Sequence, residues 1–295
     1  MTTERADNQD APWTVRRVLT WAVDDLKKRG FSSPRLDAEL LLCHVLGQDR
    51  IKLILDAERP LEKSELGRYR ELFQRRRAGE PVAYLLGVRE FYGRPFRVDR
   101  RVLIPRPDTE TLVEVALERT RHLDLCARVL DLCTGSGCVA ISLAKERPTT
   151  QVMGLDISHD AVEVAWDNMV RLGAVNCAIG QSDLYSALGA PRPWFDLITA
   201  NPPYIPEGEI AGLDVDIRGF EPHVALSGGD DGLSIMRHVV SKAPQYMARG
   251  GVLAVEMMTG QGPDVAALFE QNGFSEVLIK KDLGGRERVV SGVLA

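Results

Sequence analysis

The chain of 295 residues is long enough for one large domain and a smaller one, and its 44% hydrophobic and 27% charged content is that of a globular protein. No apolar run approaches the ~18 residues of a membrane span, and the acidic N-terminus lacks signal-peptide features, so we expect a cytoplasmic protein. Five cysteines without a CxxC pair argue against a disulfide framework or a zinc site.

Residues 14–78 predict a small helical bundle. Thr14 can cap a first helix, which Gly30 is suited to end. Ser33 followed by Pro34 indicates the start of a second helix, which runs to Gly47. Two further apolar stripes lie at residues 51–57 and at Leu66, Tyr69, Leu72 and Phe73.

Positive charge is concentrated at the end of this bundle and just after it. Between Arg68 and Arg106 the chain carries eleven arginines and only four acids. The run of Arg75, Arg76 and Arg77 can be a solvated helix end, where cations suit the helix dipole, or a docking face for an acidic or RNA-containing partner. We expect only a subset of these arginines to bind a partner, because others must pair with nearby acids.

The next segment predicts a hairpin linker. Residues 88–92 and 95–104 read as two strands joined by a turn at Gly93. Asp108 or Thr109 can then cap a helix that carries Leu112 and Val113. We therefore divide the chain into a helical substrate-recognition domain at 1–84, a β-hairpin linker at 85–105 and a larger domain at 106–295.

The larger domain alternates between strands and helices. Such alternation predicts a doubly wound α/β sheet. Two further strand-like runs near the C-terminus are separated only by residues around Gly284, which predicts an antiparallel hairpin. The predicted strands are residues 128–132, 151–156, 177–181, 195–200, 252–257, 277–281 and 288–293, and one predicted helix is 160–172.

A glycine-rich turn follows the first of these strands. Glycines between a strand and a helix let the backbone approach a ligand closely. Asp156 ends the next strand, 21 residues after Gly135, where an acid can accept hydrogen bonds from ribose hydroxyls. The alternative for Asp156 is an acid that caps the helix before Ser158. The turn consists of Cys133, Thr134, Gly135, Ser136 and Gly137.

Two nucleotide cofactors compete for this turn. An NAD site favours GxGxxG, but no glycine occupies the third position here. The antiparallel C-terminal hairpin resembles the sheet of S-adenosylmethionine methyltransferases, which favours that cofactor. In that fold Asp183, after the third strand, would face the adenine, although it can also be a simple turn aspartate.

The four residues Asn201-Pro202-Pro203-Tyr204 follow the fourth strand. The two prolines fix the backbone and remove two donors, which leaves the Asn201 side-chain oxygen and the Pro202 carbonyl as acceptors. Two converging acceptors match a planar NH2 group, on which Tyr204 can stack. The alternative is a proline-rich loop without a chemical role.

An amide nitrogen needs such a grip because its lone pair is delocalised. Acceptors for its hydrogens stabilise the cation that develops in the transition state, and alignment with a sulfonium methyl adds proximity. This chemistry requires no metal, and no cluster of residues has metal-ligand spacing.

The sequence resembles the peptide chain release factor glutamine methyltransferases, the HemK family, over nearly its whole length. The resemblance implies transfer of a methyl group from S-adenosylmethionine to the glutamine of the Gly-Gly-Gln motif in class 1 release factors. It also implies an N-terminal helical domain, a hairpin and a Rossmann-like seven-stranded domain. The segments that carry it are 34–39, 75–77, 79–81, 87–91, 103–110, 201–204, 220–222 and 282–289.

The resemblance also assigns roles to individual residues. Cofactor binding falls to Cys133, Thr134, Gly135, Ser136, Gly137, Asp156, Asp183, Leu184 and Asn201. Substrate binding falls to Asn201, Pro202, Pro203 and Tyr204, with Asn201, Pro202 and Tyr204 as the catalytic set. We expect a monomer with no direct nucleic-acid substrate.

One position departs from the family pattern, which usually has glycine where this chain has Cys133. The sequence around this cysteine resembles that of sister enzymes that methylate a glutamine of a large-subunit ribosomal protein, but those enzymes lack the sequence found here at residues 107–110. Direct methyl transfer needs no nucleophile, so none is assigned to Cys133. N6-adenine methylation of nucleic acid and a non-catalytic binding protein stay open as alternatives.

Overall fold

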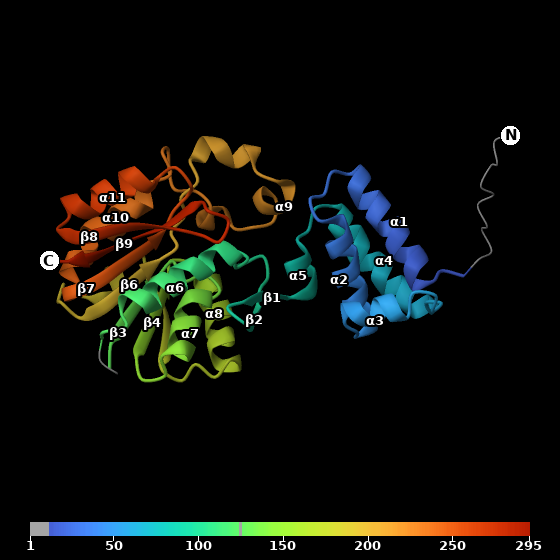
Figure 1. Cartoon of the computed structure of the whole chain (residues 1–295), viewed down its shortest axis with the longest axis horizontal. Helices are drawn as coiled ribbons and strands as arrows, with labels where there is room; N and C mark the ends of the chain where they lie inside the picture. Colours follow the sequence, from blue (N-terminus) through green and yellow to red (C-terminus); the bar gives the residue numbers. More distant parts are fainter. Residues whose placement is uncertain (1–11, 124–125) are drawn as a thin grey trace. The chain divides into compact units, whose positions relative to one another are not determined.

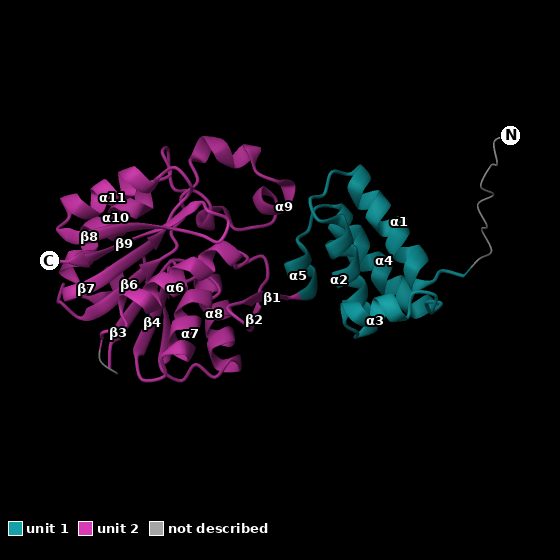
Figure 2. Cartoon of the chain, viewed as in Figure 1, with its two compact units in different colours: residues 1–86 teal, residues 87–295 magenta. Residues whose placement is uncertain are grey.

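The computed structural model describes residues 12–123 and 126–295, so the N-terminal segment in which we found no signal peptide lies outside it. The chain forms two compact units, Met1–Leu86 and Gly87–Ala295 (Figure 2). Among the described helices, none has the length and apolar composition needed to cross a membrane.

The first unit is a bundle of helices, as predicted. The Thr14 hydroxyl accepts a hydrogen bond from the Arg17 amide at 3.3 Å, and Gly47 ends the second helix in the left-handed conformation. Ser33 precedes the proline that starts that helix, but its side chain makes no capping hydrogen bond. The helices are α1 (Val15–Lys28), α2 (Pro34–Leu46), α3 (Arg50–Leu55), α4 (Lys63–Arg77) and α5 (Val82–Leu86).

The arginine run at the end of α4 is paired within this unit. Arg76 is buried and its Nε lies 2.8 Å from Asp37 Oδ2 on α2. Arg75 makes two hydrogen bonds of 2.8 Å to the Glu80 carboxylate. The Arg77 Nε lies 2.9 Å from a carboxylate oxygen of α1. Neither a solvated helix end nor a free docking face therefore describes Arg76.

The second unit begins with an antiparallel hairpin, β1 (Val88–Phe91) and β2 (Arg94–Arg97). The second strand is shorter than the predicted 95–104, because the chain turns after Val98. The Asp99 side chain accepts a hydrogen bond from the Arg101 amide at 3.0 Å, and the Asp99 carbonyl accepts one from the Val102 amide at 3.1 Å.

A seven-stranded sheet forms the rest of the unit, in the order β5-β4-β3-β6-β7-β9-β8 (Figure 1). The first five strands of this order are parallel, and β9 and β8 form the predicted antiparallel hairpin. The strands are β3 (Arg128–Leu132), β4 (Gln151–Asp156), β5 (Cys177–Gln181), β6 (Phe195–Ala200), β7 (Met247–Glu256), β8 (Phe274–Lys281) and β9 (Glu287–Leu294).

Helices cover both faces of this sheet. Along β3, Leu130 and Leu132 belong to the apolar cluster that includes α10 and α11, whereas Val129 packs with α6 and α7. β3 thus contributes alternate side chains to two cores. The helices are α6 (Glu110–Arg119), α7 (Cys138–Glu146), α8 (His159–Arg171), α9 (Val215–Arg218), α10 (Ser234–Lys242) and α11 (Gly262–Gln271).

The start of α6 differs from the expected cap. A short 3-10 turn, Pro107–Thr109, precedes the helix, and the Thr109 side chain makes no capping hydrogen bond. Its hydroxyl instead accepts a hydrogen bond from Asn201 Nδ2 at 3.4 Å. Thr109 therefore occupies the predicted N-cap position, but its side chain makes no capping hydrogen bond and contacts Asn201 instead.

Arg76→Ala should destabilise the first unit strongly, because it leaves the Asp37 carboxylate buried without its cation. We expect a loss of about 3–5 kcal/mol in the free energy of unfolding, measured by urea titration with circular dichroism. Arg16→Ala is the matched control: Arg16 and its partner Glu58 are 66% and 74% exposed, and this pair should contribute about 0–1 kcal/mol. Equal losses in the two variants would contradict this account of the run.

Candidate functional site

A cavity of about 610 Å³ lies in the second unit, at the edge where the parallel strands end. The sheet register pairs Leu132 with both Leu155 and Ala200, so the segments after β3, β4 and β6 start side by side. Of the residues predicted from the sequence, the cavity is lined by Cys133, Thr134, Gly135, Ser136, Asp156, Asp183, Leu184, Asn201 and Pro203. Gly137, Pro202 and Tyr204 are not among its lining residues.

The glycine-rich turn depends on the left-handed backbone. Gly137 has φ 80° and supports packing, since a Cβ there would lie 2.8 Å from Ile141 Cδ1. Cys133 also adopts a positive φ, 55°, which a side chain disfavours. This geometry explains why glycine suits the position in the family pattern. Burial raises the pKa of the Cys133 thiol, which keeps it protonated.

Asp156 connects the turn to the next helix. Its Oδ2 accepts a hydrogen bond from the Gly135 amide at 2.8 Å, and its Oδ1 accepts one from the Ser158 amide at 2.9 Å. Ser158 itself caps α8, through the Ala161 amide at 3.2 Å. The Ile157 amide also donates to this carboxylate, so three of its roughly four lone-pair sites are occupied and about one remains for a ligand in the cavity. Burial raises the pKa of Asp156, and the amide donors oppose this rise.

The turn after β5 holds Asp183 and Leu184 at the cavity wall. The Ser182 hydroxyl donates to the Leu184 carbonyl at 2.7 Å and accepts from the Ala187 amide at 3.0 Å. Leu184 has φ 46°, so this turn too uses the left-handed conformation. These hydrogen bonds fix the backbone of the turn, and the Asp183 side chain takes no part in them.

A buried acid beneath the turn was missed by the sequence analysis. Asp131, inside β3, accepts hydrogen bonds from the hydroxyls of Thr134 at 2.6 Å and Thr199 at 2.8 Å. Burial raises the pKa of Asp131 to about 6. The available signal was an acid within an apolar strand that precedes a glycine-rich turn.

The loop 201–204 follows β6. Asn201 Nδ2 donates to Thr109, while neither Asn201 Oδ1 nor the Pro202 carbonyl accepts a hydrogen bond from the described residues. The Tyr204 hydroxyl donates to Glu256 Oε1 at 3.2 Å, and the Tyr204 carbonyl accepts from Gln261 Nε2 at 3.1 Å. Two acceptors of the loop, Asn201 Oδ1 and the Pro202 carbonyl, therefore remain without a donor, while Glu256 and Gln261 hold Tyr204 in place.

Glu256, the last residue of β7, was also missed. It is 1% exposed, and burial raises its pKa to about 7. Arg288 opposes this rise, as do hydrogen bonds from the Thr109 and Tyr204 side chains. Arg288 itself lies 3.0 Å from Asp108 Oδ2. The available signal was an acid at the carboxyl end of an apolar strand, at the same sheet edge as Asn201.

The mouth of the cavity joins two of the segments that carry the family resemblance. Arg106 pairs with the buried carboxylate of Glu221, and burial raises the pKa of Glu221. The Arg100 guanidinium lies 4.7 Å from the centroid of the Phe220 ring. Residues 100–106 and 220–222 are therefore held together beside the cavity.

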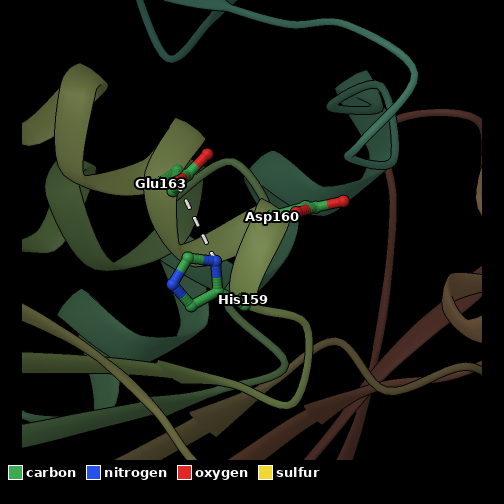
Figure 3. A group of neighbouring side chains, drawn as sticks. All are labelled: His159, Asp160 and Glu163. Carbon is green, nitrogen blue, oxygen red and sulfur yellow. Dashed lines mark ion pairs between the residues drawn. The ribbon is translucent and has the colours of Figure 1, made fainter.

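Outside the cavity, the described residues include one group that could hold a metal ion: His159, Asp160 and Glu163 on the first turns of α8 (Figure 3). All three are exposed, and Glu163 Oε2 lies 2.9 Å from Arg101 Nη1. Exposed groups of this kind are common without an ion, so we assign no metal to it.

Comparison with known proteins gives the family. Residues 17–87 match the PrmC N-terminal domain and residues 108–214 match the methyltransferase small domain. The release factor glutamine methyltransferase of Geobacter sulfurreducens is 43% identical over 280 residues, which are 95% of this chain and 96% of that protein. The protein of the same name from Rhodopirellula baltica is 42% identical over 290 residues, which are 96% of this chain and 97% of that protein.

Among solved structures, the release-factor-specific protein-(glutamine-N5) methyltransferase of Alicyclobacillus acidocaldarius is 32% identical. The match covers 68% of this chain and 99% of that one, with a TM-score of 0.42. The two relatives described first extend over both units at above 40% identity. The chain therefore belongs to the release factor glutamine methyltransferase family.

Proposed function

We propose that this enzyme transfers a methyl group from S-adenosylmethionine to the side-chain amide nitrogen, N5, of the glutamine in the Gly-Gly-Gln motif of class 1 release factors. Family membership supports the reaction and the substrate class. The observation that carries the proposal is Asn201, which lines a glycine-rich cavity and whose Oδ1 accepts no hydrogen bond from the described residues; the carbonyl of the next residue, Pro202, is likewise without a donor.

The cavity has the features required for the methyl donor. Its volume lies within the range of pockets for drug-sized ligands and cofactors, roughly 300–1,000 Å³. Asp156 keeps about one lone-pair site for a ribose hydroxyl, and Asp183 with Leu184 can border the adenine. The turn at 133–137 can receive the rest of the cofactor, whose sulfonium supplies the methyl group. These assignments, with a cofactor contact at Asn201, are part of the proposal.

The chain activates the nucleophile by accepting its hydrogens. Asn201 Oδ1 and the Pro202 carbonyl each accept a hydrogen bond from the glutamine NH2 group. The nitrogen would bond to the methyl carbon as the carbon–sulfur bond of the donor breaks, S-adenosylhomocysteine would leave, and the nitrogen would then lose one of its two protons. Because the positive charge grows on this nitrogen as the methyl arrives, both acceptors bind the transition state more strongly than the ground state. Pro203 keeps the loop rigid, and Tyr204 completes the substrate site.

The alternatives fit less well. Methylation of a ribosomal-protein glutamine or of adenine would use the same acceptors, but the two curated relatives named above are release factor enzymes. Residues 109–295 carry 15 basic and 25 acidic residues, which disfavours a nucleic-acid substrate at this unit. The intact turn and acceptor pair favour an enzyme over a binding protein. We further propose that the enzyme acts as a monomer.

The division of labour along the chain belongs to the same proposal. We assign substrate recognition to residues 1–84, a linking role to 85–105 and catalysis to 106–295. A glutamine in a glycine-rich loop offers little surface for the catalytic cavity to bind, so affinity has to come from contacts remote from the reaction. Free glutamine should accordingly be a poor substrate.

Mass spectrometry of a class 1 release factor incubated with the enzyme and S-adenosylmethionine tests the proposal. We expect one added methyl group on the peptide that contains Gly-Gly-Gln, with fragmentation placing it on the glutamine side chain. A release factor with glutamate at that position is the control and should gain none. A methyl group found on a ribosomal protein or on nucleic acid in parallel reactions, and none on the release factor, would reject the proposal.

Asn201→Ala should reduce kcat by about 10²-fold or more, because it removes one of the two acceptors of the transition state. The affinity for S-adenosylmethionine, measured by calorimetry, should fall much less. Near-normal turnover of this variant would be incompatible with the acceptor mechanism.

Asp156→Ala should weaken binding of S-adenosylmethionine by about 10- to 100-fold, the effect of losing hydrogen bonds to a charged group. Part of this loss comes from the Gly135 amide, whose acceptor disappears. Asp160→Ala, which removes an exposed acid from the start of the same helix, is the matched control and should leave the Kd unchanged. If both variants bind the cofactor normally, Asp156 has no role in the cofactor site.

A further inference from the structure

We infer that Thr109 and Glu256 are positioning residues, which fix the orientation of the Asn201 side-chain amide so that its oxygen and not its nitrogen faces the substrate. This inference rests on the proposed function. It concerns two residues that no sequence motif singled out for this role. The evidence is the convergence of three separate segments behind the loop 201–204.

The three segments meet because of the sheet register. Ala200 pairs with Val255 across β6 and β7, so Asn201 and Glu256 leave the sheet at the same level. Thr109 closes the 3-10 turn before α6, a helix that packs against β7. Its hydroxyl accepts a hydrogen bond from the Asn201 amide at 3.4 Å and lies near enough to lower the pKa of Glu256, whose buried Oε2 has no hydrogen-bond partner among the described residues.

The direction of the hydrogen bonds follows from the chemistry of the groups. A carboxylate can only accept, whereas a threonine hydroxyl has one hydrogen to donate and lone pairs to accept with. If Thr109 donates its hydrogen to Glu256, it can only accept from Asn201. The NH2 end of the Asn201 amide must then point toward Thr109, which leaves Oδ1 for the glutamine.

The charges around Glu256 support this direction. Burial raises the pKa of Glu256 to about 7, so this direction holds for the ionised form, which Arg288 favours; the charge of Arg288 is itself shared with Asp108 and Asp282. The Tyr204 hydroxyl donates to the same carboxyl group, which again makes Glu256 the acceptor. Glu256 thus holds both ends of the loop: Tyr204 directly, and Asn201 through Thr109.

An incorrectly oriented Asn201 would work against the reaction. With the amide reversed, its NH2 group would face the NH2 group of glutamine, and two donors repel. The energetic difference between the two orientations must come from the protein, because the oxygen and nitrogen ends of the amide have almost the same shape. Thr109 is the hydroxyl that makes this distinction among the described residues in contact with the Asn201 amide.

The first experiment compares Thr109→Val, Thr109→Ser and Glu256→Gln with the unaltered enzyme on intact release factor. Valine removes the hydroxyl and keeps the shape, so kcat should fall by about 10- to 100-fold, the scale of a misplaced catalytic group. The Kd for S-adenosylmethionine should rise much less than kcat falls, since the proposed cofactor contacts at residues 133–137, Asp156 and Asp183 stay in place. Serine should restore most of kcat, and Glu256→Gln should lower it, because its NH2 end can donate to Thr109.

Thr120→Val is the matched control. Thr120 is also buried, lies just after the other end of α6 and donates its hydroxyl hydrogen to the Ala116 carbonyl. This variant reports the cost of removing a buried hydroxyl away from the cavity, and its kcat should be unchanged. A full kcat in Thr109→Val, a failure of serine to rescue, or an equal loss in Thr120→Val would each overturn the inference.

The second experiment needs no substrate. The side-chain amide protons of Asn201 are observed by NMR in the ligand-free enzyme and assigned by their loss in Asn201→Asp. Thr109→Val should shift these resonances and speed their exchange with water, whereas Thr120→Val should not. Unchanged Asn201 resonances in Thr109→Val would overturn the inference. If the unaltered enzyme fails to methylate release factor, the proposed function fails, and this experiment still decides the positioning role.

Discussion

Parallel pairing of β4, β3, β6 and β7 is the constraint on which the rest of this structure depends. Because the four strands run in one direction and in matched register, four segments that are far apart in the sequence leave the sheet at the same edge. That edge carries the glycine-rich turn, Asp156, Asn201 and Glu256. The two apolar cores on either side of the sheet hold this arrangement rigid, so small polar groups can be aimed within a cavity.

The chemistry requires polar groups of two kinds at this edge. Hydrogen-bond acceptors must face the substrate, because they stabilise the positive charge that develops on the amide nitrogen as it reacts. Other polar groups must be buried behind the acceptors, because an isolated loop of prolines would not fix the orientation of a side-chain amide. Burying Glu256 is unfavourable, and its contacts with Tyr204, Thr109 and Arg288 offset only part of that cost, because its pKa is still raised to about 7.

Local patterns predicted much of this from the sequence, including the sheet, its terminal hairpin and the residues that line the cavity. Cys133, Asp156 and Asn201 were found because each belongs to a short motif at a strand end. Asp131 and Glu256 were missed, and Thr109 was expected only as a helix cap, because their roles depend on contacts between segments far apart in the chain. The same limit applies to Arg76, whose partner Asp37 is 39 residues away. The sequence shows a basic run, but only the fold shows which acids neutralise it.

A crystal structure of the enzyme with S-adenosylhomocysteine and a class 1 release factor would test most directly whether Asn201 Oδ1 and the Pro202 carbonyl accept hydrogen bonds from the substrate glutamine. The account predicts the glutamine amide nitrogen at hydrogen-bonding distance, about 2.7–3.2 Å, from both Asn201 Oδ1 and the Pro202 carbonyl. The Asn201 Nδ2 should still lie on the Thr109 hydroxyl. A glutamine whose NH2 group points away from these two acceptors, or whose carbonyl oxygen occupies their place, would contradict the claim.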